Sequence, residues 1–587
     1  MVRGTWLLVA LPLLLAAFTI TRPPALPPPA LPPAFDGAVA SQLARELARD
    51  YPDRTPGSAG ALGAANWVSE QLELYGYRLQ RDRFRATIPG RGEVDLLNLV
   101  AVVRGASDRA IVVTAHRDTA DADTGVNDNA SGTAALIELA RSYARSVSTT
   151  AEAPRPSHTL VFVSTDGGAF GGLGAARFAE RSTYRGNALA VIGLDGIGGL
   201  GAPRLAIGGD TARSPAASLV RTAAVRVLEQ AGEEPEHASA LRQLLDLGFP
   251  FAPGEQGSFV ARGVPAVRIA TVPEEHAPRP GQLLDPERLG ELGRASQNLI
   301  GSLDAGLELT RGTTSYVYLG TRIVRGWAIE LVLLSALLPF AIGAIDLFAR
   351  CRRRRIPLGG AVRNLRARLL FWAFAAALIL AAGRLGALPE GEARPLPAEP
   401  GLYTPSGAVL AVLGAVLVVA WFFWRERLFP RRQATAEETL AGHTVALLAL
   451  GLLALVVVAT NPFSLVYLLP SLYAWLWLPQ AYEAPRLARA ALLALGFAGP
   501  LILLLSFAAR LDLGLETPWY LATLVTVGYV PWIAVALGVV WCAIAAQLTA
   551  ITAGRYAATT SARARGPRPP LRLVRPRAGD QRKALEG

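Results

Sequence analysis

The chain has 587 residues, of which 51% are hydrophobic and 18% are charged, and it carries a formal net charge of +12 at pH 7. This apolar content excludes a disordered or collagen-like chain, and two cysteines, Cys351 and Cys542, exclude a disulfide-stapled secreted module. Residues 36–325 hold 33 acidic and 30 basic residues, whereas residues 326–587 hold 13 acidic and 26 basic ones. Because the positive excess lies beside apolar segments, we expect no nucleic-acid partner.

The N-terminal segment, residues 1–21, contains an apolar run at 5–20 after a short basic start. The run is a little shorter than the ~20 residues of a spanning helix, and no small-x-small cleavage site follows it. We therefore expect a transmembrane signal anchor, with a cleaved signal peptide as the alternative. Residues 22–35 are rich in proline and predict a stiff, extended linker that holds the next domain away from the bilayer.

Residues 36–310 show short apolar runs that alternate with helical patterns. The predicted strands are 96–103, 110–115, 159–164, 189–194 and 265–270, and the predicted helices include 57–75, 132–145, 214–230 and 286–303. This alternation predicts an α/β domain with a mostly parallel sheet and helices on both faces. In such sheets, functional sites form at the carboxyl ends of the strands.

After a connector at 311–326, residues 327–553 predict an all-α membrane domain of about seven helices. The expected spans are 327–349, 369–388, 404–424, 440–460, 463–481, 490–508 and 529–551. Pro531 is expected to divide the stretch 518–551 into a short interfacial piece and a full helix. No gathered set of intramembrane charges supports a transporter or pump, so we expect an anchor or packing platform in the lipid bilayer.

Arginines indicate the topology of this multi-pass chain. The loop 350–368 carries eight arginines and no acid, and the tail 554–587 carries nine basic residues. With the loops 425–439 and 482–489, these segments hold 23 of the 26 basic residues in this half. Because cytoplasmic loops are enriched in arginine and lysine, both termini are predicted to be cytoplasmic and residues 36–325 extracytoplasmic.

Candidate metal ligands follow the predicted strands. The strand 110–115 ends in His116-Arg117-Asp118, and the string N-D-N-A-S-G follows at 127–132. A histidine at a strand end, with a carboxylate two residues later, suits a metal ligand and its orienting partner. Asp128 lies in a loop that leads into a predicted helix. Asp195 follows the predicted strand 189–194, and His276 follows the predicted strand 265–270. Singly, a strand-end aspartate is more often a turn or helix cap, and a loop histidine is more often simply hydrated.

The ordered set resembles the family of co-catalytic di-zinc aminopeptidases over about residues 40–305. The wider fold also includes the glutamate carboxypeptidase and transferrin receptor ectodomains. The resemblance implies that His116, Asp128 and Asp195 hold one zinc ion and that Asp128 bridges to a second. It implies that His276 is a ligand of the second zinc ion and that Asp118 orients His116.

The sequence departs from this family where the pattern D-G-E-E-x-G-L-x-G is expected. Residues 166–174 read D-G-G-A-F-G-G-L-G, so Gly168 replaces the general base and Ala169 replaces a metal ligand. Loss of a general base costs roughly 100- to 10,000-fold in rate. The second zinc ion would keep only two protein ligands, fewer than the three of an ordinary catalytic site. The ligands thus suffice for one zinc ion and fall short for two.

Other acidic residues near these positions are possible substitutes, and the remaining histidines have simpler interpretations. The candidate substitutes are Asp166, Asp121, Asp123, Glu274 and Glu275. We expect His158, His237 and His443 to be hydrated, since the first two lie in polar stretches and the third lies near a helix end.

Two hypotheses follow. The domain order resembles that of the endoplasmic-reticulum and vacuolar membrane metallopeptidases. The first hypothesis is a membrane-bound member of this zinc-metallopeptidase family, ancestrally an aminopeptidase for peptides outside the cytoplasm, with degraded catalytic capacity. The second is an inactive pseudopeptidase whose ectodomain binds peptides or a protein partner without turnover, as the nicastrin ectodomain does. Gly168 and Ala169 favour the second hypothesis for actual activity.

Overall fold

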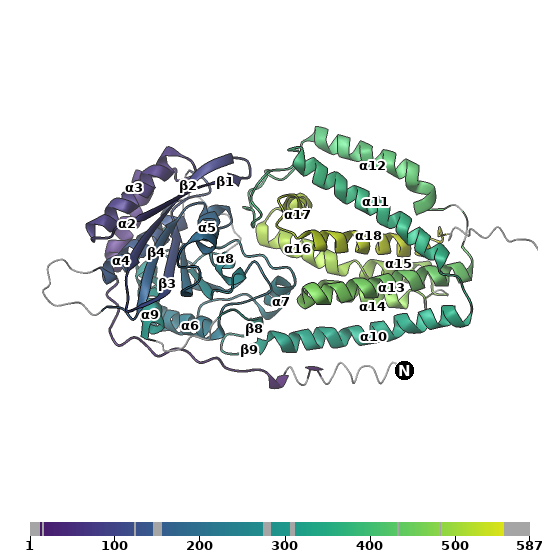
Figure 1. Cartoon of the computed structure of the whole chain (residues 1–587), viewed down its shortest axis with the longest axis horizontal. Helices are drawn as coiled ribbons and strands as arrows, with labels where there is room; N and C mark the ends of the chain where they lie inside the picture. The colour runs from purple at the N-terminus through teal and green to yellow at the C-terminus, as the bar shows by residue number, and fades with distance from the viewer. Residues whose placement is uncertain are drawn as a thin grey trace, which may run out of the picture.

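A computed structural model shows a sheet-containing domain joined to a long helical region (Figure 1). It describes residues 12–13, 17–122, 125–144, 155–273, 283–305, 312–430, 432, 434–481 and 483–556. Most of the predicted signal anchor, the histidine at 276 and the basic tail from 557 onward therefore lie outside the described residues.

The central sheet of the domain has seven strands in the order β1-β2-β4-β3-β5-β7-β6. The four strands β4, β3, β5 and β7 run parallel, whereas β1, β2 and β6 are antiparallel to their neighbours, so the sheet is mixed. The strands are β1 Gln80–Ile88, β2 Gly92–Val103, β3 Ser107–His116, β4 His158–Thr165, β5 Ala188–Asp195, β6 Arg204–Ala206 and β7 Ala266–Ala270. All five predicted strands are confirmed.

Helices cover both faces of this sheet, as the apolar runs predict. Alternate residues of β3 face opposite sides: Ile111 and Val113 pack with one core, and Val112 packs with the other. The helices are α2 Gly37–Asp50, α3 Ala59–Leu74, α4 Gly132–Tyr143, α5 Leu173–Arg181, α6 Ala217–Ala231, α7 Ala240–Gly248, α8 Gln256–Ala261 and α9 Pro286–Ala305. Helices α5 and α8 pack on the second face, and most of the others pack on the first. The α/β architecture is therefore confirmed.

Within the described residues, the helical region contains five helices that are long and apolar enough to cross a membrane. They are α10 Gly326–Arg353, α11 Gly359–Arg384, α12 Gly407–Leu428, α13 Ala436–Thr460 and α18 Trp532–Thr552. Helices α15 Arg486–Leu495 and α16 Ala498–Leu511 form a further apolar pair, bent by 52°.

Two shorter helices complete this region. Where the span 463–481 is expected, α14 Leu465–Trp477 has 13 residues, about 20 Å, which is shorter than the ~30 Å hydrocarbon core. Helix α17 Thr517–Thr526 precedes α18, and Pro531 is the N-cap residue of α18. Proline lacks an N–H group, so it is well tolerated where a helix begins. The predicted division at Pro531 is confirmed.

The proline-rich linker is extended, but it packs along the domain and does not act as a free spacer. The backbone N–H of Leu26 donates to Thr222 on α6, and that of Phe35 donates to Gln297 on α9. Thr21 bridges to Ile323 in the connector, which forms the hairpin β8 Tyr316–Tyr318 and β9 Ile323–Arg325. The linker therefore ties the start of the chain to the base of α10.

The sheet domain and the helical region share a buried interface around α7 and the segment after it (Figure 1). Phe251 is 3% exposed, and its ring lies 5.0 Å from that of Phe507 on α16. Asp246 on α7 pairs with Arg510 at 2.6 Å. The α11–α12 loop, residues 385–406, adds a second contact, in which Arg394 lies 3.2 Å from Asp210. The two parts are thus packed together through apolar and charged contacts.

Candidate metal centre

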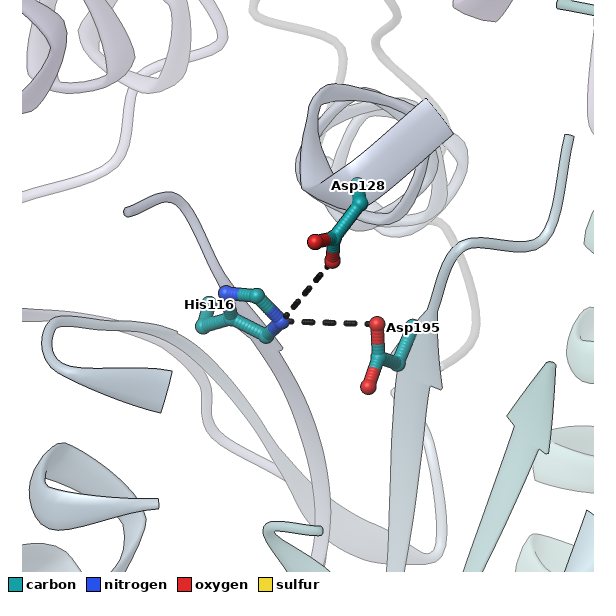
Figure 2. Close-up of side chains that lie close together, drawn as sticks. All are labelled: His116, Asp128 and Asp195. Atoms are coloured by element: carbon teal, nitrogen blue, oxygen red, sulfur yellow. Dashed lines mark hydrogen bonds and ion pairs between the residues drawn. The ribbon is translucent and has the colours of Figure 1, made fainter. Parts of the chain in front are cut away.

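Three of the predicted ligands meet at one edge of the sheet (Figure 2). His116 ends β3 and Asp195 ends β5, and these strands are parallel neighbours, so their side chains emerge side by side. The Nε2 atom of His116 lies 3.3 Å from Oδ1 of Asp195 and 3.7 Å from Oδ1 of Asp128. Asp128 comes from η1, Val126–Ser131, the turn that leads into α4.

The two asparagines of the N-D-N string hold the Asp128 turn in place. Asn129 Nδ2 donates to the carbonyl of Leu194 at 2.9 Å, and its Oδ1 accepts from the N–H of Gly196, also at 2.9 Å. Asn127 Oδ1 accepts from the N–H of Gly198 at 3.1 Å. These bonds fasten the turn to the end of β5, which explains why the string surrounds the aspartate.

Electrostatics in this cluster favour an added cation. Burial and the nearby carboxylate of Asp195 raise the pKa of Asp128 to about 7. Burial lowers the pKa of His116, but the carboxylates of Asp195 and Asp118 outweigh it, and the net pKa is raised well above the ordinary value. Burial raises the pKa of Asp195, but Arg268 and His116 outweigh it, and the net pKa is lowered. The raised pKa of Asp128 therefore indicates that this buried carboxylate lacks a sufficient cationic partner, a role that a metal ion would fill.

The donor set fits a zinc ion. One imidazole nitrogen and two carboxylate oxygens, all within 4.8 Å of one another, are ligand types that zinc takes in proteins, and three protein ligands suit a site with an open position. Asp195 Oδ2 is held at 2.7 Å by Arg268 on β7, which leaves Oδ1 turned toward His116. The fourth predicted ligand, His276, lies outside the described residues.

Asp118 lies behind His116, as expected of an orienting carboxylate. Its Oδ1 lies 3.4 Å from Nδ1 of His116, and its backbone oxygen lies 3.1 Å from the same nitrogen. The Asp118 carboxylate also accepts the N–H groups of Gly168 at 2.8 Å and Ala169 at 3.0 Å. It is fully buried, so all of its interactions are with the protein.

These two bonds bring the loop that lacks the glutamates of the expected pattern directly against the candidate metal ligand His116. A Cβ atom built on Gly168 would lie 2.2 Å from Cβ and 2.3 Å from Cγ of His116. Gly167, Gly171 and Gly172 all have φ between 66° and 80°, a region in which glycine is favoured. The loop has therefore closed into the space that a longer side chain would need.

The candidate substitutes do not restore a base next to the cluster. Asp166 pairs with Arg117 at 2.8 Å and accepts the N–H of Leu97 at 3.1 Å, so its carboxylate is occupied elsewhere. Asp121 is exposed and does not belong to the described cluster. The other three substitutes, Asp123, Glu274 and Glu275, lie outside the described residues.

One acidic residue near the site was missed by the sequence analysis. Glu255 is 4% exposed, and its carboxylate accepts a hydrogen bond from the hydroxyl of Thr165 at the end of β4. Burial raises its pKa, and the charge of His116 lowers it in part. Glu255 lies in an irregular segment rich in glycine and proline that has no helical or strand periodicity. The one sequence signal for a functional role is that this acidic residue stands alone among small and apolar residues.

The remaining histidines differ from expectation at two positions. His158 pairs with Asp304 at 3.3 Å and has a side chain that is only 15% exposed, so it is not simply hydrated. His443 is 5% exposed because neighbouring helices cover it within α13. His237 is exposed, as predicted, and its ring contacts Tyr318.

Comparisons with known proteins agree with this geometry. The model of peptidase family M28 matches residues 98–278, which include His116, Asp128 and Asp195. A probable zinc metalloprotease from Pyricularia oryzae is 31% identical over 160 residues, 24% of this chain and 30% of that protein. An inactive zinc metalloprotease from Schizosaccharomyces pombe is 27% identical over 188 residues, 32% of this chain and 22% of that protein.

The matches cover less than a third of the length of these curated relatives. Among solved structures, an aminopeptidase from Aneurinibacillus sp. is similar over 45% of this chain and 93% of its own chain. The identity is 14% and the TM-score is 0.36. The family match and the three-residue cluster coincide in the same segment. The chain therefore carries a domain of peptidase family M28 over residues 98–278.

Proposed function

We propose that this chain is a membrane-held M28 protein whose sheet domain binds one zinc ion and engages peptides outside the cytoplasm with little or no hydrolysis. The zinc ion would be held by His116, Asp128 and Asp195, whose ligand atoms already converge. The apolar helices would hold the chain in the bilayer, and the arginine-rich loops support a cytoplasmic position for both termini.

The observation that carries this proposal is the closed loop at Gly168. A metallopeptidase needs a metal to polarise the scissile carbonyl and a base to take the proton from the attacking water. When bound, zinc would supply the Lewis acid. At position 168 the chain supplies a backbone N–H that is already bonded to Asp118, with no room for a carboxylate. A zinc-bound, base-less site would bind a peptide end and turn it over poorly.

A second candidate function is slow peptide hydrolysis with Glu255 as the base. Its carboxylate is buried, has a raised pKa because of burial, and accepts a hydrogen bond from Thr165 at the end of β4. A carboxyl group with a raised pKa is suited to accept a proton near neutral pH. In this case Glu255 would act from the segment that leads into α8, and not from the loop after β4 in which the family's glutamate is expected.

Turnover by the purified full chain, saturated with zinc, separates the two functions. We expect cleavage of aminoacyl amides and short peptides to stay at background in the wild type. Hydrolysis above background that is lost in both Asp195→Ala and Glu255→Gln would overturn the binding proposal and favour the second function. Glu138→Gln is the matched control, because Glu138 is an equally buried carboxylate on α4 that pairs with Arg141, away from the centre.

A further inference from the structure

A pocket of about 350 Å³ lies where the sheet domain, the β8–β9 hairpin and the helical region meet. This volume falls at the lower end of the ~300–1,000 Å³ typical of small-ligand sites. Its walls come from β6, the segment after it, α7, β7, Tyr316 on β8 and Arg510 on α16. Arg510 comes from the helical region, so packing of the two parts of the chain completes the wall of the pocket.

The charges that line this pocket are predominantly positive. Five arginines line it, against two carboxylates: Arg204, Arg213, Arg242, Arg268 and Arg510, against Glu236 and Asp246. Glu236 pairs with Arg204 at 2.5 Å, and Asp246 is shared between Arg510 at 2.6 Å and Arg242 at 3.9 Å. Among the described residues, Arg213 makes no ion pair. The lining thus has more cationic groups than its own carboxylates neutralise.

One residue, Arg268, belongs both to the wall of the pocket and to the surroundings of the candidate metal centre. This arginine is 4% exposed, lines the pocket and donates to Oδ2 of Asp195 at 2.7 Å. A peptide whose terminal residue lies at the metal cluster would therefore have this arginine, and the pocket that it lines, beside it.

Two buried hydroxyl groups in the wall still lack hydrogen-bond partners. Tyr316 is 2% exposed, and its hydroxyl has no partner among the described residues; neither does the buried hydroxyl of Thr211. A buried polar group without a partner is costly, and a ligand that accepts hydrogen bonds would remove this cost. Arginines with hydroxyl donors are the groups that recognise a carboxylate.

We propose that this pocket receives the acidic side chain of a peptide whose terminal residue lies at the metal centre. The inference rests on the proposed function for the choice of a peptide as ligand. It names the substrate class: peptides that begin with glutamate or aspartate are selected over those with neutral residues. A lipid headgroup carries a similar negative charge, but the hydrogen bond from Arg268 to Asp195 places the pocket next to the metal ligands and favours the peptide.

The test is equilibrium binding to the zinc-loaded full chain in nanodiscs of zwitterionic lipid. The probes are two pentapeptides with a C-terminal fluorophore that differ only in an N-terminal glutamate or glutamine. We expect the glutamate peptide to bind about tenfold more tightly, since hydrogen bonds to a charged group contribute this much. Arg213→Gln and Arg510→Gln should each reduce the preference to about threefold or less.

Arg78→Gln is the matched control, because Arg78 is exposed and lies just before β1, at the opposite edge of the sheet from β6. Arg213 is also exposed, so its substitution tests the pocket even if Arg510→Gln disturbs packing against Asp246. Equal binding of both peptides to the wild type would overturn this inference alone. Failure of both peptides to bind would overturn the proposed function with it. Loss of the preference in nanodiscs of anionic lipid would assign the pocket to a headgroup and also overturn the inference.

Discussion

The backbone at Gly168 leaves no room for a side chain, because a Cβ atom there would lie 2.2 Å from that of His116. We expect Gly168→Ala to lower the stability of the fold by about 1–3 kcal/mol, as overpacking does, and to weaken zinc binding by displacing the imidazole. Thermal melts and zinc titration measure both effects.

Gly186→Ala is the control for this substitution, because a Cβ atom at Gly186 would meet nothing within 4 Å. It should leave stability and zinc affinity close to those of the wild type. A Gly168→Ala variant that melts and binds zinc like Gly186→Ala would show that the loop does not close against His116. It would also mean that a glutamate side chain could fit at this position.

Zinc affinity should depend on pH because Asp128 must lose a proton before it can bind a metal. Burial and Asp195 raise its pKa to about 7 in the metal-free protein, so the group is mostly protonated at pH 6 and mostly charged at pH 8. A raised carboxyl pKa means that protons compete with zinc at low pH, and affinity rises as pH increases through 7. We expect a gain of about tenfold per pH unit below pH 7 for each proton displaced.

Competition with a chromophoric chelator at pH 6, 7 and 8 measures this dependence. Asp128→Asn should bind zinc more weakly and with a shallower pH slope, because the amide has no proton to lose in this range. A wild-type affinity that is constant from pH 6 to 8 would contradict a protonated, metal-ligating Asp128.

At the scale of elements, the α11–α12 loop contacts the sheet domain beside the metal centre. Arg394 pairs with Asp210, donates to Ser258, and lies 3.4 Å from the carbonyl oxygen of Gly171, in the same loop as Gly168. Arg394 and Asp210 have side chains only 13% and 10% exposed. The helical region therefore braces the loop that replaces the family's glutamate segment.

Arg394→Ala should destabilise the full chain by about 3 kcal/mol, because it leaves Asp210 buried without its cationic partner. Arg384→Ala removes an exposed arginine at the end of α11 and should change stability little. Thermal unfolding of both variants in the same detergent makes the comparison. Equal melting temperatures would show that the loop does not brace the domain.

The elements that were predicted are those with a continuous apolar signal. Strands β3, β4 and β5 are buried on both faces, and each reads as an uninterrupted apolar run. Strand β1 was missed because it lies at the edge of the sheet and carries exposed arginines along its length. Helix α7 was missed because it is only nine residues long, and part of its buried face is completed by the helical region.

The ligands of the candidate site could be placed from the sequence because each one ends a strand or enters a helix. Glu255 could not, since it belongs to no periodic segment and approaches the site only through tertiary packing. The closure of Gly168 onto His116 is likewise a tertiary contact, although the missing glutamates are visible in the sequence.

At the scale of the whole molecule, the sheet domain is not independent of the helices that follow it. Phe251 is buried against Phe507 and Tyr520, and Tyr529 donates to the carbonyl of Pro250. We expect residues 36–325 expressed alone to expose this surface and to melt at a lower temperature than the full chain. Exposure would appear as increased binding of a hydrophobic dye.

Phe251→Ser should make the isolated segment more soluble, because it removes an exposed ring. The same substitution should destabilise the full chain, because the full chain buries this ring. An isolated segment that melts as high as the full chain and binds no dye would contradict the shared interface.

We expect this M28 domain to hold one zinc ion and not the two of a co-catalytic centre. The most direct test is the number of zinc ions per full-length chain after saturation and removal of excess metal, measured by mass spectrometry against protein concentration. We predict one ion in the wild type and a loss of that ion in His116→Ala and Asp195→Ala. Two ions per wild-type chain, or one ion that survives both substitutions, would contradict it.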